Sequence, residues 1–548
     1  MYISKVIIKN FKSFREPFCL NLNKGLNIIV GNNGTGKSTI LEAIHLALSG
    51  LSNGRYFKND LSEYFFNYDS VHEYLDSLDT NKPLPPPEIS IEVFIGGNDL
   101  PFFEGDDNST KRSECGICFK IALAEKFRGE YNDYVKDGGI AALPIEFYEV
   151  DWTTCARESI TPRKIPIKSA LIDSSSNRYK NGSDVYISHI IKNHLDEKDR
   201  NGLAHAHRRL QAAFIQDTSV VNVNNIINGL AKDEVNNKNI KLTVDLSSKD
   251  AWEASFLTSV EDIPFHHIGK GEQSIIKTKL ALEHKKSKEA NIILLEEPEN
   301  HLSHSRLNQL IRNIHDKCSD KQILISTHSS FVANKLGLEN LIIVENRKSV
   351  RLKDLPSTTQ DFFEKIPGYD TLRLILCKKA ILVEGDCDEL LVQRAYMDSN
   401  GGRLPIQDQV DVISVGTSFL RFLQIAEKIN KPVSVVTDND GKPDAIQAKY
   451  ADYLGVNSKP GIKICYDVNV DVGDLKIADK PFNYNTLEPK FLKSNGVENI
   501  NRILGTKNKT EDQLHEYMKA NKTDCALKIF ETKEKLTFPQ YILDAIEK

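Results

Sequence analysis

The feature that most constrains the fold of this chain is a glycine-rich turn near its N-terminus. Residues 31–38 read Gly-Asn-Asn-Gly-Thr-Gly-Lys-Ser and match the pattern G-x-x-x-x-G-K-[ST] in full. An apolar segment at 25–30 predicts a strand before the turn, and the periodicity of 39–48 predicts a helix after it. Backbone N–H groups of such a turn curl around phosphates, and the helix N-terminus adds positive potential. The turn therefore predicts an α/β fold that binds a nucleoside triphosphate.

The side chains of this turn indicate how ATP and Mg²⁺ would be held. Lys37 would neutralise charge on the β- and γ-phosphates, and the Ser38 hydroxyl would ligate Mg²⁺. The residues predicted to bind the nucleotide here are Asn32, Asn33, Gly34, Gly36, Lys37, Ser38 and Thr39.

Two later strands are predicted to complete the ATPase. The apolar run 291–295 leads into Glu296 and Glu297, and the run 322–326 is followed closely by His328. We expect Glu296 to lie near Mg²⁺, Glu297 to polarise the attacking water and His328 to sense the γ-phosphate. A lone histidine after a strand is more often structural, but its order in this series favours the catalytic interpretation.

A second glycine-rich segment, with Lys270, Gly271 and Glu272, precedes those acids. The order of these motifs resembles the ABC ATPase family, especially its SMC/RecF-like branch. In that family two heads sandwich ATP between the turn of one head and this signature of the other, so the resemblance implies a dimer. Lys270 stands where the family commonly has serine, and we expect it to act as a cation in trans. The stretch between Ser38 and Gln211 contains no glutamine, so the family's glutamine loop is not placed.

The middle of the chain predicts a short helical insertion. Segments 187–195 and 203–214 have amphipathic periodicity, but no heptad run is sustained, so the long coiled-coil arm of SMC-type proteins is absent. We interpret 181–235 as a dimerisation insertion. The histidines and arginines of 205–209 are read as a solvated helix face rather than a metal site. The predicted division is two ATPase parts, 1–180 and 236–355, around this insertion, and a further domain at 356–548.

Beyond residue 378, strands and helices alternate, which predicts a parallel sheet with ligands at the carboxyl ends of its strands. One apolar strand runs into Glu384, and another, at 433–437, runs into Asp438 and Asp440. Each acid alone could be a helix cap or a solvated loop residue. Three at matched strand ends favour a site for Mg²⁺, with Mn²⁺ or Ca²⁺ as alternatives. Asp388, one helical turn after Glu384, is expected on the same face and completes a possible second metal site.

This strand–Glu-Gly and strand–Asp-x-Asp pattern resembles the Toprim domain of topoisomerases, primases and some nucleases. An ABC head followed by a Toprim domain resembles the OLD (overcoming lysogenisation defect) nuclease family. The resemblance implies a further metal ligand, Glu488, and a lysine that assists at the scissile phosphate. We assign that lysine to Lys522, with Lys533 and Lys535 as alternatives. Glu384 is then either a metal ligand or the general acid/base.

The resemblance implies an ATP-regulated, metal-dependent DNA endonuclease in defence against phage, assembled as a homodimer or larger oligomer. A helicase or a retron-type reverse transcriptase with its DNA is a possible second component. The alternative is an ATP-switched DNA-binding or repair clamp with a regulatory Toprim domain. A topoisomerase or primase would need a DNA-linking or priming module, and none is found. The choice of DNA or RNA and the direction of the ATP effect stay open.

The bulk composition fits these interpretations. Lys+Arg 71 against Asp+Glu 76 give a net charge of −5, so no global positive field marks a nucleic-acid binder, although local patches can serve. No run of about 18 apolar residues predicts a spanning helix. Nine scattered cysteines fit reduced thiols, and we expect a cytoplasmic protein.

Overall fold

A computed structural model gives the structure of this protein. It describes residues 1–52, 55–80, 82–97, 100–136, 140–173, 197–231, 259–283, 291–300, 302–317, 321–345, 347–352, 355–366 and 370–547. These residues form two compact units. The first comprises 1–29 and 36–327, and the second comprises 30–35 and 328–548.

The first unit contains an antiparallel sheet with the strand order β2-β1-β6-β8-β7, in which β9 also pairs with β8. Strands β2 and β9 alternate buried with more exposed side chains, whereas β6 is buried at most of its positions. Their bounds are β1 (Tyr2–Lys9), β2 (Phe18–Asn21), β6 (Ile89–Gly96), β7 (Glu104–Gly105), β8 (Glu114–Leu123) and β9 (Tyr148–Thr154). The strands predicted at 88–95 and 117–124 are confirmed as β6 and β8.

A second sheet of this unit consists of parallel strands in the order β10-β13-β14-β3. They are β3 (Leu26–Val30), β10 (Ser169–Asp173), β13 (Ile292–Glu296) and β14 (Gln322–Ser326). Nearly every side chain of β13 and β14 is buried, which explains why these segments read as continuous apolar runs. Gln322 of β14 accepts a hydrogen bond from Ile3 N and donates to Ile3 O, both at 2.8 Å, and so fixes the two sheets to each other.

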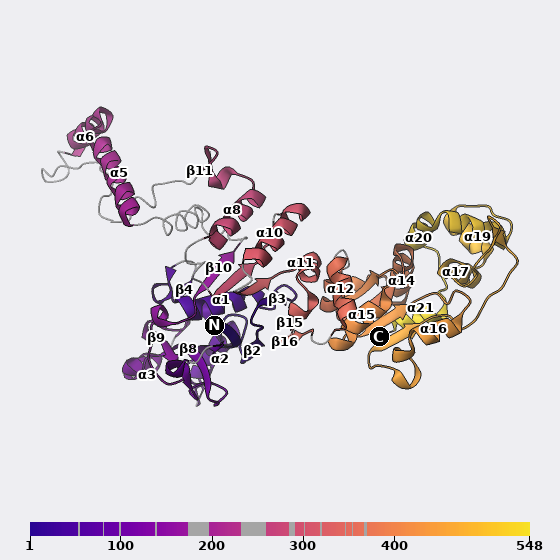
Figure 1. The fold of residues 1–548 in the computed structure, drawn as a ribbon, viewed down its shortest axis with the longest axis horizontal. Helices are drawn as coiled ribbons and strands as arrows, with labels where there is room; N and C mark the ends of the chain where they lie inside the picture. Colours follow the sequence, from indigo (N-terminus) through magenta and orange to yellow (C-terminus); the bar gives the residue numbers. More distant parts are fainter. Residues whose placement is uncertain are drawn as a thin grey trace. The chain divides into compact units, whose positions relative to one another are not determined.

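The helix after the glycine-rich turn, α1 (Lys37–Ser49), contacts strands of both sheets. It is buried on almost all sides, and Trp152 of β9 donates its indole N–H to Ala47 O at 2.9 Å. The other helices of the unit are α2 (Tyr68–Leu78), α3 (Arg128–Lys136), α5 (Glu197–Gln216), α6 (Thr218–Ala231), α8 (Lys270–Glu283) and α10 (His304–Lys317), most of them labelled in Figure 1.

The predicted insertion is helical where the structure describes it. Helices α5 and α6 contact each other, and the helix predicted at 203–214 lies within α5. The segment 187–195 lies outside the described residues. Several large apolar side chains of the pair are exposed, and they are Leu210, Phe214, Val221, Val223 and Ile226. Among the described helices, none has the length and apolar character needed to cross a membrane.

The second unit contains a four-stranded parallel sheet of order β18-β17-β19-β20. The strands are β17 (Lys379–Val383), β18 (Val410–Ser414), β19 (Val433–Val436) and β20 (Ile462–Cys465). Helix α14 (Asp386–Ser399) connects β17 to β18, and α15 (Phe419–Lys428) connects β18 to β19. The chain thus moves outward from β17 to β18 and then returns past β17 to β19, as in doubly wound sheets. The predicted α/β fold class is confirmed.

Helices from the C-terminal part of the chain share one core with this sheet. Ile381 and Val383 of β17 belong to the same buried cluster as Leu391 of α14 and Phe491. The helices are α17 (Leu487–Asn495), α18 (Val497–Leu504), α19 (Glu511–Ala520), α20 (Lys522–Glu531) and α21 (Gln540–Ile546), and the short α16 (Pro443–Lys449) follows β19 outside this cluster. Before the sheet come β15 (Leu341–Glu345) and β16 (Lys348–Arg351), with α11 (Ser330–Lys335), α12 (Ser357–Lys365) and α13 (Thr371–Leu376).

Arg394, a buried residue of α14, fixes the end of α20. Its guanidinium donates to the carbonyls of Phe530 at 2.8 Å and of Thr532, and it forms an ion pair with Asp398 at 2.8 Å. A cation at the C-terminus of a helix satisfies carbonyls that have no partner within the helix. Helix α20 is therefore held against α14 through its last turn, while its first residue is Lys522.

Replacing this buried cation tests how far α20 depends on it. We expect Arg394→Met to lower the free energy of unfolding by about 2–4 kcal/mol, because Asp398 and several carbonyls lose their partner. Urea unfolding measures the change. Arg403→Met, which removes a largely exposed pair with Asp408, serves as control and should cost less than about 1 kcal/mol. Equal losses in the two variants would contradict the assignment.

Candidate functional site

The turn before α1 requires glycine at position 36. Gly36 is the N-cap of α1, with a φ of 98°. A Cβ there would lie 2.6 Å from Cζ of Phe14 and 2.7 Å from Oγ of Ser13. Any other residue would be strained and would clash. The turn therefore delivers Lys37 to the first position of α1, where the lysine is buried.

Lys37 faces the carboxylates that follow β13. Burial lowers the pKa of Lys37, and the charges of Glu297, Glu296 and Glu299 oppose that shift. Glu297 has a positive φ of 42°, and its carboxylate accepts a hydrogen bond from Asn300 at 2.7 Å. The charges of Glu296 and Glu297 therefore act on Lys37, and their joint role at the nucleotide stays a prediction. Glu299 was not predicted, because it lies beyond the strand in an irregular turn.

The other predicted ATPase residues lie as follows. Ser38 and Thr39 follow Lys37 in the first turn of α1. Lys270, Gly271 and Glu272 form the first turn of α8, where Lys270 and Glu272 are exposed to solvent. The second unit holds Asn32, Asn33, Gly34 and His328.

In the second unit, the strand order brings the predicted acids to one edge of the sheet. β17 and β19 are parallel neighbours, with Leu382 opposite Val435. Glu384 comes just after β17, and Asp438 just after β19. The connection that leaves β17 leads to β18 on one side of it, whereas β19 lies on the other side. The strand order therefore reverses between β17 and β19, and ligands of doubly wound sheets bind in the crevice at such a switch point. The predicted adjacency of Glu384 and Asp438 therefore follows from the observed topology.

Asp438 is electrostatically strained. Burial, together with the charges of Asp388, Glu488, Glu384 and Asp440 in that order, raises the pKa of its carboxyl to about 8. The other four carboxylates thus all act on Asp438. Like charges that cannot all be hydrated resist ionising together unless a cation joins them.

Asp388 has two roles in the structure. One carboxylate oxygen accepts a hydrogen bond from Gly385 N at 2.9 Å and so caps the start of α14. The pKa of Asp388 is nevertheless raised to about 6, mainly by burial. The hydrogen bond from Gly385 lowers this pKa, and the charges of Glu488 and Glu384 raise it. Asp388 therefore caps a helix, a role that the sequence analysis did not assign to it, and it still belongs to the cluster.

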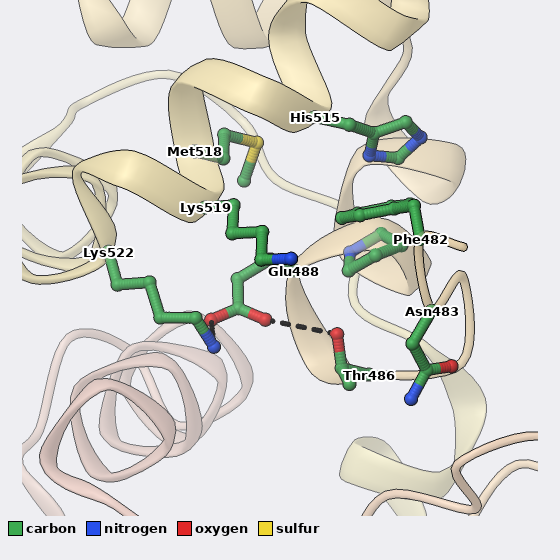
Figure 2. Close-up of a pocket in the computed structure, with 9 residues that line it drawn as sticks. Phe482, Asn483, Thr486, Glu488, His515, Met518, Lys519 and Lys522 are labelled. Atoms are coloured by element: carbon green, nitrogen blue, oxygen red, sulfur yellow. Dashed lines mark hydrogen bonds and ion pairs between the residues drawn. The ribbon is translucent and has the colours of Figure 1, made fainter. Parts of the chain in front are cut away.

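Glu488, in the first turn of α17, is paired with Lys522 at the start of α20. Lys522 Nζ lies 2.6 Å from Glu488 Oε1, and Thr486 Oγ1 donates to Glu488 Oε2 at 3.2 Å, as Figure 2 shows. The two residues assigned by family resemblance therefore meet. Lys533 and Lys535, both described and exposed, form no ion pair with these carboxylates.

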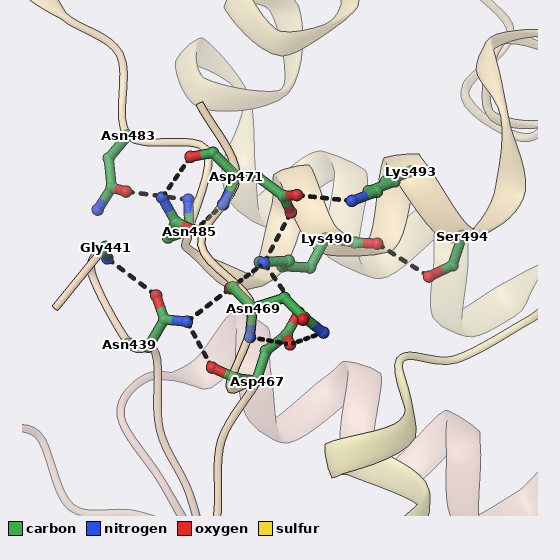
Figure 3. Close-up of polar contacts among 10 residues, drawn as sticks. All are labelled: Asn439, Gly441, Asp467, Asn469, Asp471, Asn483, Asn485, Lys490, Lys493 and Ser494. Atoms are coloured by element: carbon green, nitrogen blue, oxygen red, sulfur yellow. Dashed lines mark hydrogen bonds and ion pairs between the residues drawn. The ribbon is translucent and has the colours of Figure 1, made fainter. Parts of the chain in front are cut away.

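A network of polar contacts connects the loop after β20 and the helix α17 to Asn439, which lies between Asp438 and Asp440 in the chain (Figure 3). The buried Lys490 ammonium lies 2.8 Å from Asp467 and 2.7 Å from Asp471. Asn439, between the two predicted aspartates, donates to the carbonyls of Asp467 and of Asn469. Burial of such a pair of acids with one cation is stable only with good geometry, which these contacts supply.

The loop also reaches the exposed aspartate of the pair. Asn483 donates its amide to Asp440 Oδ1 at 2.8 Å, and Asn485 is held by Asp471 O at 2.8 Å. Asn439 and Asn483 were not predicted as site residues. Asparagines in a loop carry no signal of their own, because their partners come from distant positions in the chain.

Tyr541 of α21 is a further residue that sequence reasoning missed. Its side chain is buried, and burial together with the charges of Asp438 and Asp388 raises its pKa well above 10. The phenol therefore stays protonated beside the acids. Only the packing of α21 against β19 and β20 brings it there.

The donor set fits a divalent cation in chemistry but is not gathered around one point. Carboxylate oxygens are the ligands that Mg²⁺ and Mn²⁺ prefer. Burial, and to a smaller extent repulsion from the neighbouring carboxylates, raises the pKa values of Asp438 and Asp388, and a bound cation would offset both effects. Within the described parts of the chain, no three His, Cys, Asp or Glu side chains converge closely enough to hold an ion. Binding would therefore draw these side chains inward.

Comparison with known families agrees with the two sites. Residues 5–366 match the AAA domain family. Residues 375–440 match the TOPRIM domain of proteins like the overcoming lysogenization defect protein, and this match contains Glu384, Asp388, Asp438 and Asp440. The chain belongs to the OLD family of ATPase–Toprim fusions. Family membership implies use of ATP and a divalent metal in general.

Curated relatives match this OLD family protein over short segments. A DNA replication and repair protein RecF from Pasteurella multocida is 30% identical over 20% of the chain and 29% of its own length. A DNA double-strand break repair Rad50 ATPase from Archaeoglobus fulgidus is 32% identical over 26% of the chain and 15% of its own length. The chain therefore spans less than a third of either relative.

Solved structures overlap with more of the chain. The RecF–ATP structure covers 64% of it and 99% of its own chain, at 11% identity and a TM-score of 0.34. The SMC head domain from Thermotoga maritima covers 65% of it and 100% of its own chain, at 14% identity and a TM-score of 0.30.

The strained carboxyl of Asp438 predicts a pH-dependent stability. Its pKa is about 8 in the folded chain against an ordinary 3.8, so the folded state binds this proton more tightly and loses stability as pH rises from about 4 to 8. We expect Asp438→Asn, without divalent ions, to unfold like wild type at or below about pH 4, the lower end of this window. At pH 8.5 it should be more stable by about 1–3 kcal/mol. Urea unfolding at both pH values measures this.

Asp440→Asn is the matched control, because Asp440 is exposed and its removal should change the pH dependence much less. If wild type and Asp438→Asn lose stability with pH at the same rate, repulsion among these carboxylates does not lower the free energy of unfolding.

Proposed function

We propose that this OLD family protein cleaves phosphodiester bonds of DNA with a divalent metal held at the Toprim site, under control of its ATPase. The observation that carries the proposal is the cluster of five carboxylates at the switch point of the parallel sheet, with Lys522 paired to one of them. A repair ATPase would not need a group of acids in which burial and neighbouring charges oppose the ionisation of Asp438. The DNA-related names of the RecF and Rad50 relatives support the choice of DNA.

The metal would be held by Glu384, Asp438 and Asp440, with Asp388 and Glu488 at a second position. When bound, Mg²⁺ or Mn²⁺ would lower the pKa of water and stabilise charge on the attacking and leaving oxygens. Tyr541 would stay neutral and limit access of bulk water from the α21 side. The loop fixed by Lys490 would hold Asn483 against Asp440 and so orient that carboxylate.

Lys522 would supply the positive charge for the scissile phosphate. Its side chain is about half exposed and already pairs with Glu488, so a phosphate oxygen can share or replace that partner at little cost. If Glu488 moved toward a metal, the ammonium would become available to the substrate. Lysine binds phosphate as a compact point charge, which suits this role.

ATP control would come from the buried Lys37 and the acids after β13. Glu297 would orient the water that attacks the γ-phosphate, and Glu296 and Ser38 would ligate Mg²⁺. Pairing of two heads would bring Lys270 of one copy to the nucleotide of the other. A role in defence against phage, with a helicase or reverse-transcribed DNA as a second component, rests on the family alone.

One observation favours the alternative of a repair clamp whose Toprim domain does not cleave. In the described residues, no three metal-ligating side chains converge on one point. A regulatory Toprim domain would leave its carboxylates apart even in the presence of Mg²⁺ or Mn²⁺. The cleavage experiment below separates the two functions.

We expect the full chain to nick or cut plasmid DNA with Mg²⁺ or Mn²⁺ and to lose that activity in EDTA. Glu384→Gln should lower the rate about 100-fold or more, because one metal ligand or general acid/base is lost. Agarose-gel assays with ATP, ADP and a non-hydrolysable analogue measure the activity and show the direction of control. Glu498→Gln, an exposed acid of α18, should cleave like wild type.

If the wild-type protein does not cleave DNA under any combination of metal and nucleotide, but its DNA binding responds to ATP, the protein is the clamp instead. Cleavage that Glu384→Gln leaves unchanged would show that the activity does not come from this site.

The helical insertion would hold two copies together. The exposed Leu210 and Phe214 of α5 form an apolar surface that a second insertion could cover. We expect Leu210→Glu with Phe214→Glu to convert a dimer to a monomer in light scattering after gel filtration. Tyr64→Glu, at a residue 81% exposed outside the insertion, should leave the mass unchanged. A wild-type monomer at all concentrations, with and without ATP, would rule out this assembly.

A further inference from the structure

A small pocket opens beside the candidate metal site. It has a volume of about 100 Å³ and is lined by Phe482, Asn483, Thr486, Glu488, Pro489, His515, Met518, Lys519 and Lys522, most of them labelled in Figure 2. Glu488 and Lys522 belong to the site already described, and Asn483 donates to Asp440. The pocket and the carboxylate cluster are therefore continuous through three residues.

One end of the pocket is aromatic. The ring of Phe482 packs on the imidazole of His515 with centroids 4.9 Å apart, and Tyr484 contacts both rings from outside the pocket, at 5.0 and 5.4 Å. Met518, itself buried, adds a polarisable side chain of the kind that contacts aromatic rings favourably. His515 is buried, and its Nε2 accepts or donates no hydrogen bond among the described residues, with Glu511 Oε1 3.6 Å away.

The other end of the pocket is cationic. Lys522 Nζ is bound to Glu488, and Lys519 Nζ lies 5.6 Å from the centroid of Phe482. Figure 2 shows both lysines on the side of Glu488, with Phe482 and His515 across from them. The Lys519 ammonium thus lies over the Phe482 ring and the Lys522 ammonium lies farther along, on Glu488. Aromatic rings next to ammonium groups match the two halves of a nucleotide, a planar base and an anionic phosphate.

We propose that this pocket binds one unpaired nucleotide of the DNA strand next to the phosphate that the carboxylate cluster attacks. The base would stack on the ring of Phe482 and contact His515 and Met518. Its phosphate would contact Lys519 and Lys522. A pocket of about 100 Å³ is too small for a base pair, so a base would enter it out of the stack. The proposal rests on the proposed nuclease function and deepens it: the preferred substrate is single-stranded DNA, or a duplex locally opened at the cleavage position.

Binding measured in EDTA tests the pocket without cleavage. The probes are a fluorescein-labelled single-stranded 20-mer and its duplex, followed by fluorescence anisotropy with the full chain. We expect Phe482→Ala to weaken single-strand binding about 5- to 100-fold, because one base loses its stacking surface, and to change duplex binding little. Phe482→Trp should retain single-strand binding. Lys519→Ala should weaken it, and Lys507→Ala, an exposed lysine of the same unit, should not.

A second measurement needs no variant. The fluorescence of 2-aminopurine, placed at each position of the single strand in turn, should be quenched at one or a few positions when wild type binds, because the base stacks on Phe482. Unquenched fluorescence at every position, or Phe482→Ala binding single strands like wild type, would overturn the pocket. Deoxyadenosine monophosphate competing as well as the oligonucleotide would overturn a strand substrate in favour of a free nucleotide.

The outcomes separate this inference from the function on which it rests. Stacking and single-strand binding with no cleavage under any condition would reject the nuclease and keep the pocket. Metal-dependent cleavage that is equally fast on single strands and duplexes, and unaffected by Phe482→Ala, would keep the nuclease and reject the pocket.

Discussion

The repulsion among carboxylates at the carboxyl ends of β17 and β19 is the constraint on which the second unit depends. Glu384 and Asp438 are adjacent because the strand order reverses at this point, and the burial of Asp438 reduces the screening of its charge by water. The raised pKa of Asp438, about 8, expresses that cost. A chain selected only for stability would place neutral side chains there, so the arrangement indicates a bound cation or substrate.

The surroundings of the cluster show how this cost is tolerated. Arg394 fixes α20 at its last turn, so Lys522 at the first turn reaches Glu488. Lys490 neutralises two further acids behind the site and lowers the pKa of both Asp467 and Asp471 against the effect of their burial. Two buried cations thus stabilise elements that carry the site, without touching the carboxylates that would bind metal.

Sequence alone predicted the parts of the sites that lie at strand ends or in a contiguous motif. The sequence predicted Lys37 near Glu296 and Glu297, and Glu384 beside Asp438, because parallel strands end at the same edge of a sheet. The meeting of Lys522 with Glu488 needed the family resemblance, since it depends on how α20 packs on α14. Tyr541, Asn439 and Asn483 could not be predicted at all, because only tertiary packing brings them to the acids. The helices α5 and α6 were predicted from periodicity, whereas their role as a dimerisation insertion stays a prediction.

The proposed function depends on a divalent cation bound between β17 and β19. The most direct measurement is the anomalous scattering of Mn²⁺ in crystals of the full chain grown with that ion. We predict one or two anomalous peaks bounded by Glu384, Asp438 and Asp440, with these side chains closer together than in the structure described above. Crystals that show Mn²⁺ elsewhere in the chain but no peak among these carboxylates would contradict the account.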